Sequence, residues 1–504
     1  MINIIDRFLN SITMYRLILY GLVIISATAF IFSFLGISSI DTVSLIKSLA
    51  ILLVVTFISN FALSKIFKAS INAESFAITA LILFLILFPG DLFSDFVTIA
   101  LAGFIAMLSK YVLTVNKKHI FNPTAFALVV IGITGNNLAS WWIGSPELLP
   151  VVAIVGFLIL RKIHRFSLFL SFAIISVAVI SFSSFLNGVN PASLITNSLT
   201  SSLIIFFGCI MLTEPITSPP TKKLQIIYGA VVGILFGLQF QIGPIISTPE
   251  LALVIGNIFS YIVSPKQKLF LKLKEKNKIA KDSYEFVFDK NKEFNFSPGQ
   301  YMEWTTPQYT TDSRGNRRYF TIASSPTEDD MKIGIRFNNP TSSFKKYLNG
   351  MKTGEKVVAS QLSGEFILPK DKNQRIAFVA GGIGITPIRS MVKYLLDKKE
   401  KRDAVLFYAC KSLEEAAYKD LLDQAEKSIG LKTIYLLSEG ELPKHIKSIR
   451  GRINKDVIKK EVPDYADRIF YLSGPELMIR AYKRLLVDMG IKRNKILTDY
   501  FPGY

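Results

Sequence analysis

The chain has 504 residues, of which 50% are hydrophobic, and its mean hydropathy is +0.39. This is too apolar for an ordinary soluble protein of that length, so we expect membrane spans and several domains. The formal net charge is +20, but basic residues gather at the ends of apolar segments and no nucleic-acid recognition motif is present, so we expect no nucleic-acid partner. Two cysteines exclude a four-thiolate iron–sulfur cluster and a disulfide framework, and we expect no metal site.

The N-terminal part predicts a polytopic α-helical membrane domain over residues 1–264. A helix needs roughly 20 apolar residues to cross a hydrocarbon core of about 30 Å, and about ten segments are candidates, some of them shorter. We expect the first segment to be retained as a span, because the residues before it do not resemble a cleaved signal. The segments lie near 16–38, 43–64, 75–89, 96–115, 122–139, 148–160, 166–186, 198–213, 225–243 and 250–264.

Basic residues occupy every second connection between these segments, whereas the intervening connections hold acidic residues and almost no Lys or Arg. The positive-inside rule then predicts a multi-pass protein of the cell membrane with both termini in the cytoplasm. If the chain has ten spans, two halves of five would have opposite orientations, as in an inverted repeat.

Two proline-containing breaks stand out in this part of the chain. The fifth segment opens with Asn122 and Pro123, and the eighth closes on residues 213–220, which hold three prolines. Breaks at membrane depth free backbone groups that usually line a buried site, although plain helix caps explain the pattern equally well. The candidates for a membrane flavin or quinone site are Thr79, Asn122, Pro123, Thr213, Glu214 and Thr217.

Residues 74–81, 121–123 and 213–219 resemble landmarks of a family of flavin-carrying membrane proteins. The Rnf electron-transport complex contains this family as its D subunit, and the Na⁺-translocating NADH:quinone oxidoreductase contains it as its B subunit. The similarity covers most of residues 40–264. That family attaches FMN to a threonine in a Ser-Gly-Ala-Thr type motif, which is absent here. The resemblance therefore implies a non-covalently bound FMN or other flavin in the membrane domain. The three histidines do not supply the paired ligands of a transmembrane haem relay, and we expect them at surfaces or interfaces.

The C-terminal part predicts two further domains. Residues 265–372 alternate polar and apolar in short runs, as in 283–288 and 332–337, which predicts an antiparallel β-barrel. Over 373–504, apolar strands near 376–380, 405–408, 433–437 and 469–472 alternate with helical segments, which predicts a doubly wound α/β domain.

Two motifs carry chemistry in this part. A strand-like run reads Arg318-Tyr319-Phe320-Thr321, and a guanidinium on a strand can bind phosphate bidentately. Glycines 381, 382 and 384, with Thr386 and Pro387, stand between a predicted strand and a helix, where backbone amides can approach a dinucleotide phosphate. Barrel, motifs and nucleotide fold, in this order, resemble the ferredoxin-NADP reductase superfamily over residues 267–504.

That resemblance implies a role for each matching residue. Arg318 would bind the FAD pyrophosphate with Ser342 and Ser343, Phe320 would pack on the flavin, and the Thr321 hydroxyl would lie near the reactive N5. Ser473 replaces the cysteine that the superfamily places near the nicotinamide. The implied FAD-binding residues are Pro298, Gly299, Gln300, Tyr301, Arg318, Tyr319, Phe320, Thr321, Ile322, Ser342 and Ser343; those for NAD(P) are Gly381, Gly382, Gly384, Thr386, Pro387, Lys411, Ser412, Gly474 and Pro475; the catalytic candidates are Thr321, Ser473, Phe501 and Tyr504.

Two questions stay open at this point. Phe501 or Tyr504 would shield the flavin ring, but a packed terminal anchor explains these aromatic residues equally well. Lys411 and Ser412 could hold the 2′-phosphate of NADPH, whereas Glu414 and Glu415 beside them would disfavour it.

We therefore predict a membrane-bound flavoprotein, an oxidoreductase of the ferredoxin-NADP reductase type that serves electron transport. Electrons would pass from NAD(P)H through FAD to a membrane-held flavin or quinone, and onward to a quinone, a flavin-bearing redox partner or an extracytoplasmic acceptor. The alternative is a transporter of a cation or small solute with an attached flavin reductase module, because inverted repeats and broken spans suit transport as well.

Overall fold

The computed structural model describes residues 2–67, 73–115, 118–135, 139–186, 188, 190, 196–197, 200–243, 245–264, 268–291, 293–308, 311–312, 315–337, 341–443 and 445–501. The chain divides into two compact units, Met1–Gln267 and Lys268–Tyr504. Each unit is described by itself below.

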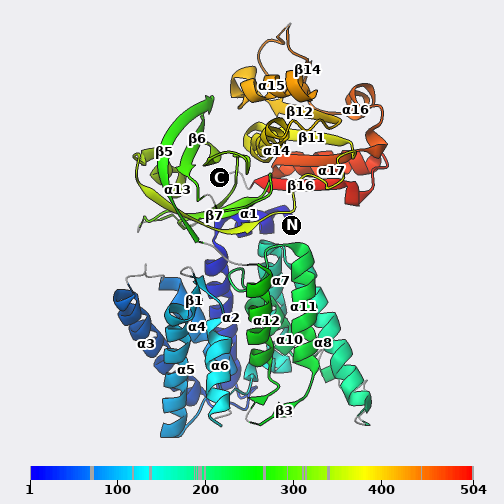
Figure 1. The fold of residues 1–504 in the computed structure, drawn as a ribbon. Helices are drawn as coiled ribbons and strands as arrows, with labels where there is room; N and C mark the ends of the chain where they lie inside the picture. The colour runs from blue at the N-terminus through cyan, green and yellow to red at the C-terminus, as the bar shows by residue number, and fades with distance from the viewer. Residues whose placement is uncertain are drawn as a thin grey trace. The chain divides into compact units, whose positions relative to one another are not determined.

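The first unit is built from helices (Figure 1). Two short hairpins join some of them, β1 (Thr114–Val115) with β2 (Lys118–His119) and β3 (Gln241–Ile242) with β4 (Ile245–Ile246). A π-helical turn, η3 (Phe207–Met211), continues the short helix α10. The helices are α1 (Ile2–Ser11), α2 (Met14–Phe34), α3 (Thr42–Ile66), α4 (Ala73–Ile86), α5 (Phe93–Val112), α6 (Pro123–Ile133), α7 (Leu149–Ile163), α8 (Phe166–Leu186), α10 (Leu203–Phe206), α11 (Lys222–Gly237) and α12 (Pro249–Val263).

The prediction of about ten membrane spans is wrong in its count. Among the described residues, four helices are long and apolar enough to cross a membrane, and they are α2, α3, α5 and α8. The other predicted segments contain shorter helices, and α6 is an example. Its 11 residues rise only about 16 Å at 1.5 Å per residue, roughly half of a hydrocarbon core.

Local chemistry explains where several of these helices begin. The side chains of Asp41, Asn122, Thr221 and Thr248 each accept a hydrogen bond from a backbone amide in the first turn of α3, α6, α11 and α12. Pro123 and Pro249 occupy the first turns of α6 and α12, where no backbone donor is needed. Pro123, which the sequence analysis treats as part of a break, is therefore a helix start.

Small residues let α11 approach α8 closely. A Cβ added to Gly229 would lie 2.6 Å from Leu168 O, and one added to Gly233 would lie 2.9 Å from Phe172 O. Gly237 continues this row one turn later, with Ser176 O at 3.0 Å. Spacing at every fourth residue places these glycines on one helix face, so backbone meets backbone along the contact.

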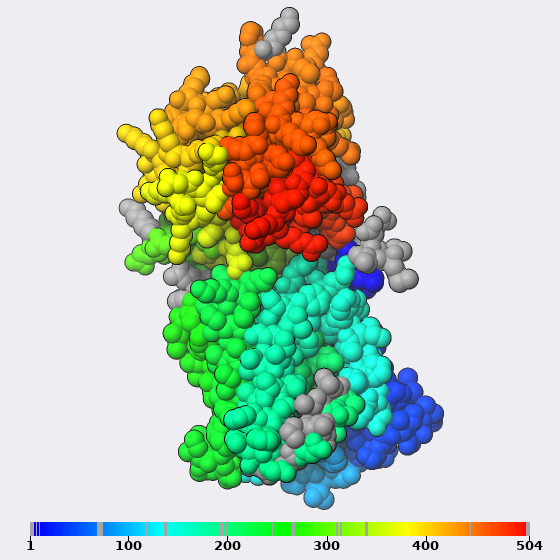
Figure 2. All heavy atoms as spheres, turned by 90° about the vertical axis from the view of Figure 1, so that its right-hand side faces the viewer, coloured from blue at the N-terminus to red at the C-terminus, as the bar shows by residue number. Residues whose placement is uncertain are grey.

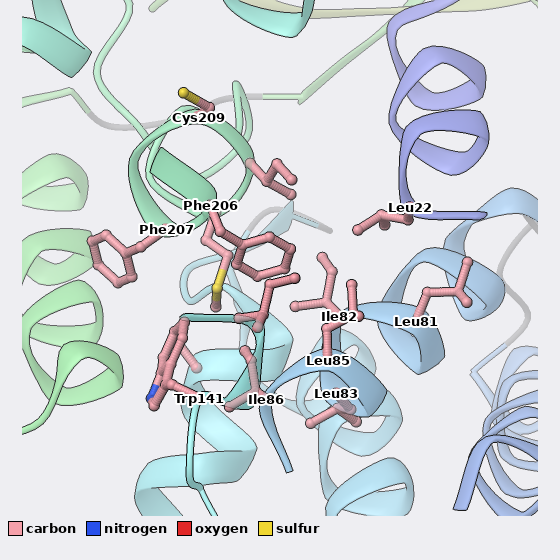
Figure 3. Packing of buried hydrophobic residues seen from close by; sticks show 14 of the residues in the cluster. Leu22, Leu81, Ile82, Leu83, Leu85, Ile86, Trp141, Phe206, Phe207 and Cys209 are labelled. Carbon is pink, nitrogen blue, oxygen red and sulfur yellow. The ribbon is translucent and has the colours of Figure 1, made fainter. Parts of the chain in front are cut away.

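The core of the first unit contains most of α4. Figure 3 shows Leu81, Ile82, Leu83, Leu85 and Ile86 of α4 among Leu22, Trp141 and Phe206. Residues 80–87 are all buried, so α4 is apolar on every side because protein surrounds it. Hydropathy alone presents this segment as a span for the same reason.

The second unit begins with a six-stranded sheet in the order β8-β7-β10-β5-β6-β9, in which every neighbouring pair is antiparallel. The edge strands β8 and β9 are linked after β8 by a hydrogen bond from Ala323 N to Lys332 O (2.7 Å). Closure of this sheet into the expected barrel stays a prediction. The elements are β5 (Lys268–Ala280), β6 (Ser283–Asp289), β7 (Tyr301–Thr305), β8 (Arg317–Thr321), β9 (Asp330–Arg336), β10 (Lys356–Ser363) and α13 (Ser343–Gly350).

A second sheet follows, in the order β14-β13-β12-β11-β15-β16, and all of its pairs are parallel. Separate hydrophobic clusters lie on its two faces, as the predicted doubly wound α/β domain requires, and this prediction is confirmed. Figure 2 shows yellow atoms beside the red atoms of the C-terminal segment on one face of the second unit. The elements are β11 (Ile376–Gly381), α14 (Thr386–Asp397), β12 (Ala404–Cys410), α15 (Lys419–Ile429), β13 (Lys432–Leu437), β14 (Ser448–Arg450), α16 (Lys455–Glu461), β15 (Ile469–Pro475), α17 (Glu476–Asp488) and β16 (Ile496–Phe501).

Candidate functional site

The glycine turn lies at the carboxyl end of β11. The strand order reverses there, because β12 lies on one side of β11 and β15 on the other, and ligands bind at such points in open parallel sheets. Gly382 has a φ of +53°, a left-handed conformation that favours glycine. A Cβ on Gly384 would lie 2.5 Å from Ser473 O and 2.6 Å from Gly474 Cα, so the turn contacts the end of β15 directly.

Hydroxyl groups hold this turn in shape. Tyr408 of β12 donates its phenol proton to Gly382 O (3.2 Å) and accepts a hydrogen bond from Ala417 N (3.0 Å). Thr386, the first residue of α14, donates to Ile383 O (3.2 Å) and is buried. The start of α14, with Pro387 in its first turn, therefore lies next to a fixed glycine loop, and a helix start beside such a loop is suited to phosphate.

Three polar side chains from different strands meet near the carboxyl ends of β15 and β16. Ser473 of β15 pairs in register with Asp499 of β16, and the hydroxyl of Thr321, at the end of β8, lies near the Asp499 carboxyl. Thr321 and Ser473 are buried, whereas Asp499 is half-buried with its Oδ2 out of solvent. Thr321 Oγ1, Ser473 Oγ and Asp499 Oδ2 have no well-aligned hydrogen-bond partner within the described part of the chain.

Burial raises the pKa of Asp499 to about 7, and the nearby Thr321 hydroxyl opposes part of this rise without forming a well-aligned hydrogen bond. A carboxyl group that changes protonation near neutral pH therefore lies beside Thr321. Sequence reasoning missed Asp499 as a site residue. The available signal was an acidic residue just before the C-terminal aromatic run, near the end of the last strand.

A second cluster surrounds the first turn of α13. Arg318 lies 5.5 Å above the ring centre of Phe344 and 3.7 Å from a carboxylate oxygen of Asp312. Asp312 accepts from Ser343 N (3.0 Å), and its own amide donates to Ser343 Oγ (3.0 Å). Ser342 caps the helix. The structure thus brings together three residues that the sequence analysis assigns to one phosphate, Arg318, Ser342 and Ser343.

The predicted flavin strand lies beside β8. Tyr301 pairs in register with Thr321, and its ring meets the half-exposed Tyr319 ring edge-on at 5.7 Å. Gln300 O accepts from Ile322 N (3.0 Å). Gly299, after Pro298, has a φ of +95°, and a Cβ there would lie 2.0 Å from Phe366 O.

The remaining predicted residues of the second unit fall into three groups. Phe320 packs its ring at 5.7 Å from Phe344. Lys411 is exposed at the end of β12 and lies 3.9 Å from Glu439, with Ser412 next to it. Gly474 has a φ of +152° and precedes the exposed Pro475. The side chain of Phe501 and the whole of Tyr504 lie outside the described residues, so their shielding role stays a prediction.

In the first unit, two of the predicted residues, Asn122 and Thr217, contact a third, Glu214. Its Oε2 accepts from Asn122 Nδ2 (3.0 Å) and from Thr217 Oγ1 (3.1 Å). Pro123 follows in the first turn of α6, and Thr213 Oγ1 donates to Cys209 O (2.5 Å) one turn back along the chain. Thr79 belongs to a neighbouring group, because its hydroxyl accepts from Lys110 Nζ at 2.7 Å.

The sequence analysis lists Glu214 among the candidates for a membrane site and expects His119 at a surface or interface, but it does not connect the two residues. The side chains of Glu214 and His119 are each 18% exposed, with His119 Nε2 3.7 Å from Glu214 Oε1. It also missed Lys110 and Asn257, whose Oδ1 accepts from Asn122 N (2.7 Å). These contacts join residues 31 to 135 positions apart, which no local pattern shows.

The model of the oxidoreductase NAD-binding domain matches residues 378–484. The chain is 26% identical over 239 residues to a flavohemoprotein of Oceanobacillus iheyensis, a match that covers 46% of this chain and 58% of that protein. It is 28% identical over 199 residues to the F subunit of the Na⁺-translocating NADH-quinone reductase of Pseudomonas aeruginosa, covering 37% and 49%. The chain spans about half the length of the curated relatives that it matches.

Similar solved structures include a ferredoxin NADP⁺ reductase from Neisseria gonorrhoeae with bound FAD and NADP, at 16% identity and TM-score 0.40, covering 46% of this chain and 98% of that one. A flavohemoglobin from Malassezia yamatoensis with bound FAD and heme has 20% identity and TM-score 0.43, covering 61% and 74%. The C-terminal half of the chain therefore contains an oxidoreductase NAD-binding domain over residues 378–484, and it is similar in sequence to flavohemoproteins and to the F subunit of the Na⁺-translocating NADH-quinone reductase.

Proposed function

We propose that this chain is a membrane-bound, FAD-dependent NAD(P)H oxidoreductase. Electrons pass from NAD(P)H through FAD in the second unit to a flavin or quinone held by the first unit, and then to a quinone, a flavin-bearing partner or an extracytoplasmic acceptor. The observation that carries the proposal is the meeting of Thr321, Ser473 and Asp499 beside the glycine turn. Thr321 comes from the end of β8 in the antiparallel sheet, which is expected to bind the flavin. Ser473 and Asp499 come from β15 and β16 of the parallel sheet, which is expected to bind the dinucleotide.

The residues present fit both cofactors. Thr321 and Ser473 each carry a buried hydroxyl whose oxygen has no well-aligned hydrogen-bond partner among the described residues, so each can hydrogen-bond a bound ring. Gly384 leaves room against Ser473 that any side chain would fill. For the FAD pyrophosphate, Arg318 lies close to the Ser342–Ser343 start of α13, and Asp312 contacts both Arg318 and Ser343 N, where a phosphate oxygen would replace it.

FAD accepts two electrons as a hydride and passes them on singly, which is the chemistry that this route needs. Thr321 and Ser473 would orient the reacting rings through their hydroxyls, and their buried surroundings would exclude water. Burial raises the pKa of Asp499 to about 7, so its carboxyl is about half protonated at neutral pH and mostly protonated below it. A neutral carboxyl tolerates the negative charge that develops on the flavin during reduction better than a carboxylate does.

The first unit is the electron acceptor side of the proposal. Four apolar helices support a membrane location, and the alternation of basic connections supports a multi-pass topology with both termini in the cytoplasm. Two observations support a non-covalent flavin or a quinone there, the resemblance to the flavin-carrying membrane family of the Rnf complex and the Na⁺-translocating NADH:quinone oxidoreductase, and the Asn122–Glu214–Thr217 group. We also propose the division into domains at 1–264, 265–372 and 373–504.

The test is flavin extraction and quantification from the full chain purified in detergent, followed by anaerobic titration with NADH and with NADPH. We expect two flavins per chain, both reduced by at least one of the nucleotides. One FAD per chain, together with solute flux in vesicles that depends on the nucleotide, would favour the transporter with an attached reductase. Colourless protein that oxidises neither nucleotide would refute the proposal.

A further inference from the structure

A buried ion pair joins the two sheets of the second unit. Arg389 of α14 donates from Nη2 to Glu328 Oε1 at 2.9 Å, and its Nη1 contacts Glu328 Oε2 as well. The side chains are 7% and 12% exposed. Glu328 lies between β8 and β9, so the pair connects the antiparallel sheet to the first helix after the glycine turn.

Further contacts reinforce this connection. Arg389 Nη1 also donates to Ala323 O (3.1 Å), and the next residue, Ser390, donates to Ser324 O (2.7 Å). The Arg389 guanidinium lies 5.5 Å from the ring centre of the half-buried Tyr418. One short stretch of α14 is thus bound to one short stretch after β8 through side chain and backbone together.

The Arg389–Glu328 ion pair lies close in sequence to both parts of the proposed site. Ala323 lies two residues after Thr321, and Arg389 lies three residues, about one helical turn, after Thr386. The pair therefore links the residue expected at the flavin N5 to the residue expected at the dinucleotide phosphate. Gly334 of β9 completes the contact, since a Cβ there would lie 2.7 Å from Thr386 Cγ2.

A buried ion pair is poor evidence for added stability, because desolvation of both charges offsets their attraction and an apolar pair of similar volume would do as well. What a bidentate pair with a further backbone acceptor does supply is one defined geometry. We propose that Arg389 is a positioning residue, which fixes the glycine turn against Thr321 so that the nicotinamide reaches the flavin in a reactive arrangement.

This inference rests on the proposed function. The step concerned is the transfer of a hydride, one proton with two electrons, from C4 of the reduced nicotinamide to N5 of FAD. The nicotinamide C–H bond breaks, the flavin N–H bond forms, and one solvent proton balances the reduced flavin. A misplacement of about 1 Å in such a step can cost on the order of a hundredfold in rate.

The chain offers a matched control in Arg468, whose side chain is 6% exposed. Arg468 donates to Ile376 O (3.0 Å), Asp403 Oδ1 (2.7 Å) and Asp464 Oδ1 (3.0 Å), so these contacts stay within the α/β part of the unit, near the ends of the strands away from the glycine turn. Arg468→Met removes a buried arginine of the same kind without releasing the antiparallel sheet. Arg389→Lys keeps the charge but loses the bidentate geometry.

The experiment uses the full chain and two measurements. Stopped-flow reduction at saturating nucleotide should show a rate of flavin reduction at least about tenfold lower in Arg389→Met, with nucleotide affinity changed little, and partial rescue in Arg389→Lys. Spin labels at two exposed positions, 277 in β5 of the antiparallel sheet and 427 in α15 beside the parallel sheet, should show a broadened distribution of label-to-label distances in Arg389→Met without any nucleotide. Arg468→Met should keep both the rate and the narrow distribution.

A rate within twofold of Arg468→Met, with an unchanged distance distribution, would overturn the positioning role. If Arg389→Met does not fold, Glu328→Gln decides the matter, since we expect the same broadening and slowing to a smaller degree, and wild-type values there would overturn it. A wild-type chain that neither NADH nor NADPH reduces would refute the proposed function, whatever the distances between the labels.

Discussion

Gly384 of the glycine turn contacts the backbone of Ser473 at the end of β15, because a Cβ on Gly384 would lie only 2.5 Å from Ser473 O. The two segments, which sequence analysis assigns separately to one nucleotide, are therefore parts of one surface. The two segments cannot separate without disturbing the pairing of β11 with β15, which joins five residues of β11, Ile376 to Ala380, to β15.

We expect Gly384→Ala to abolish this fit. The added methyl group would displace backbone atoms rather than a flexible side chain, so the turn must shift. NADH and NADPH oxidation should fall by on the order of a hundredfold while flavin content stays near that of the wild type, as measured by absorbance and steady-state kinetics. Gly350→Ala is the matched control, because nothing lies within 4 Å of its added Cβ. Equal activity of the two variants would contradict the assignment of the turn.

Asp499 predicts a pH dependence of flavin reduction. Burial raises its pKa to about 7, so the carboxyl is neutral below that pH and charged above it. The rate of reduction in stopped flow should fall as pH rises through about 7, and Asp499→Asn should keep the rate flat from about pH 6 to 8. Asp488→Asn, on the exposed end of α17, should leave the wild-type profile unchanged.

The same group predicts an effect on stability. The folded-state pKa of about 7 lies above the unfolded value of about 3.9, so the folded chain binds the proton more tightly and loses stability as pH rises between these two values. The loss is complete once pH has risen through about 7. Asp499→Asn should therefore gain stability over the wild type above that pH and not below about pH 4, as measured by urea unfolding. A wild-type chain whose rate has no transition near pH 7, and whose stability relative to Asp499→Asn does not change with pH, would contradict the role of Asp499.

Acid stability should depend on Glu328. Burial acts to raise its pKa, but the hydrogen bond and charge of Arg389 outweigh burial and lower the pKa to about 2. Because the unfolded value is about 4.3, the stabilisation is present above about pH 4.3 and is lost as pH falls toward 2. The midpoint of urea unfolding, read from the buried Trp304 in a chain with Trp141 and Trp142 replaced by Phe, should show it. Glu328→Gln should be less stable than wild type by roughly 2–3 kcal/mol at pH 6, with the gap closing at low pH.

Much of the second unit follows from its sequence. The strands 376–380 and 405–408 are short apolar runs between helical segments, and they are adjacent parallel strands in the structure. The glycine turn at 381–384 could be recognised because the hydrophobic pattern on its two sides predicts a strand and a helix. The roles of Asp499 and of the Arg389–Glu328 pair could not be predicted, since the first depends on burial and the second joins residues 61 positions apart.

The first unit shows where hydropathy fails. A window average measures how apolar a segment is, not whether lipid or protein surrounds it, so the buried α4 and the short α6 look like spans. Local pattern also hides the long-range contacts of Glu214, although the residue itself is a candidate in the sequence analysis. Its partners Asn122 and His119 come from 92 and 95 residues earlier in the chain.

The contact between α11 and α8 gives a test of the first unit that needs no cofactor. A Cβ on Gly233 would lie 2.9 Å from Phe172 O and 3.1 Å from Ile175 Cβ, so backbone and a branched side chain must both give way. Glycine faces of this kind hold helices together in lipid through close packing, since no hydrophobic force acts between them there. We expect Gly233→Leu to lower the thermal midpoint of the detergent-purified chain by several degrees and to increase cleavage by protease within residues 166–237. Gly132→Leu in α6 is the control, because nothing lies within 4 Å of a Cβ there, and it should behave like wild type. If the two leucine variants melt together with the wild type, α11 and α8 do not depend on this glycine row for their packing.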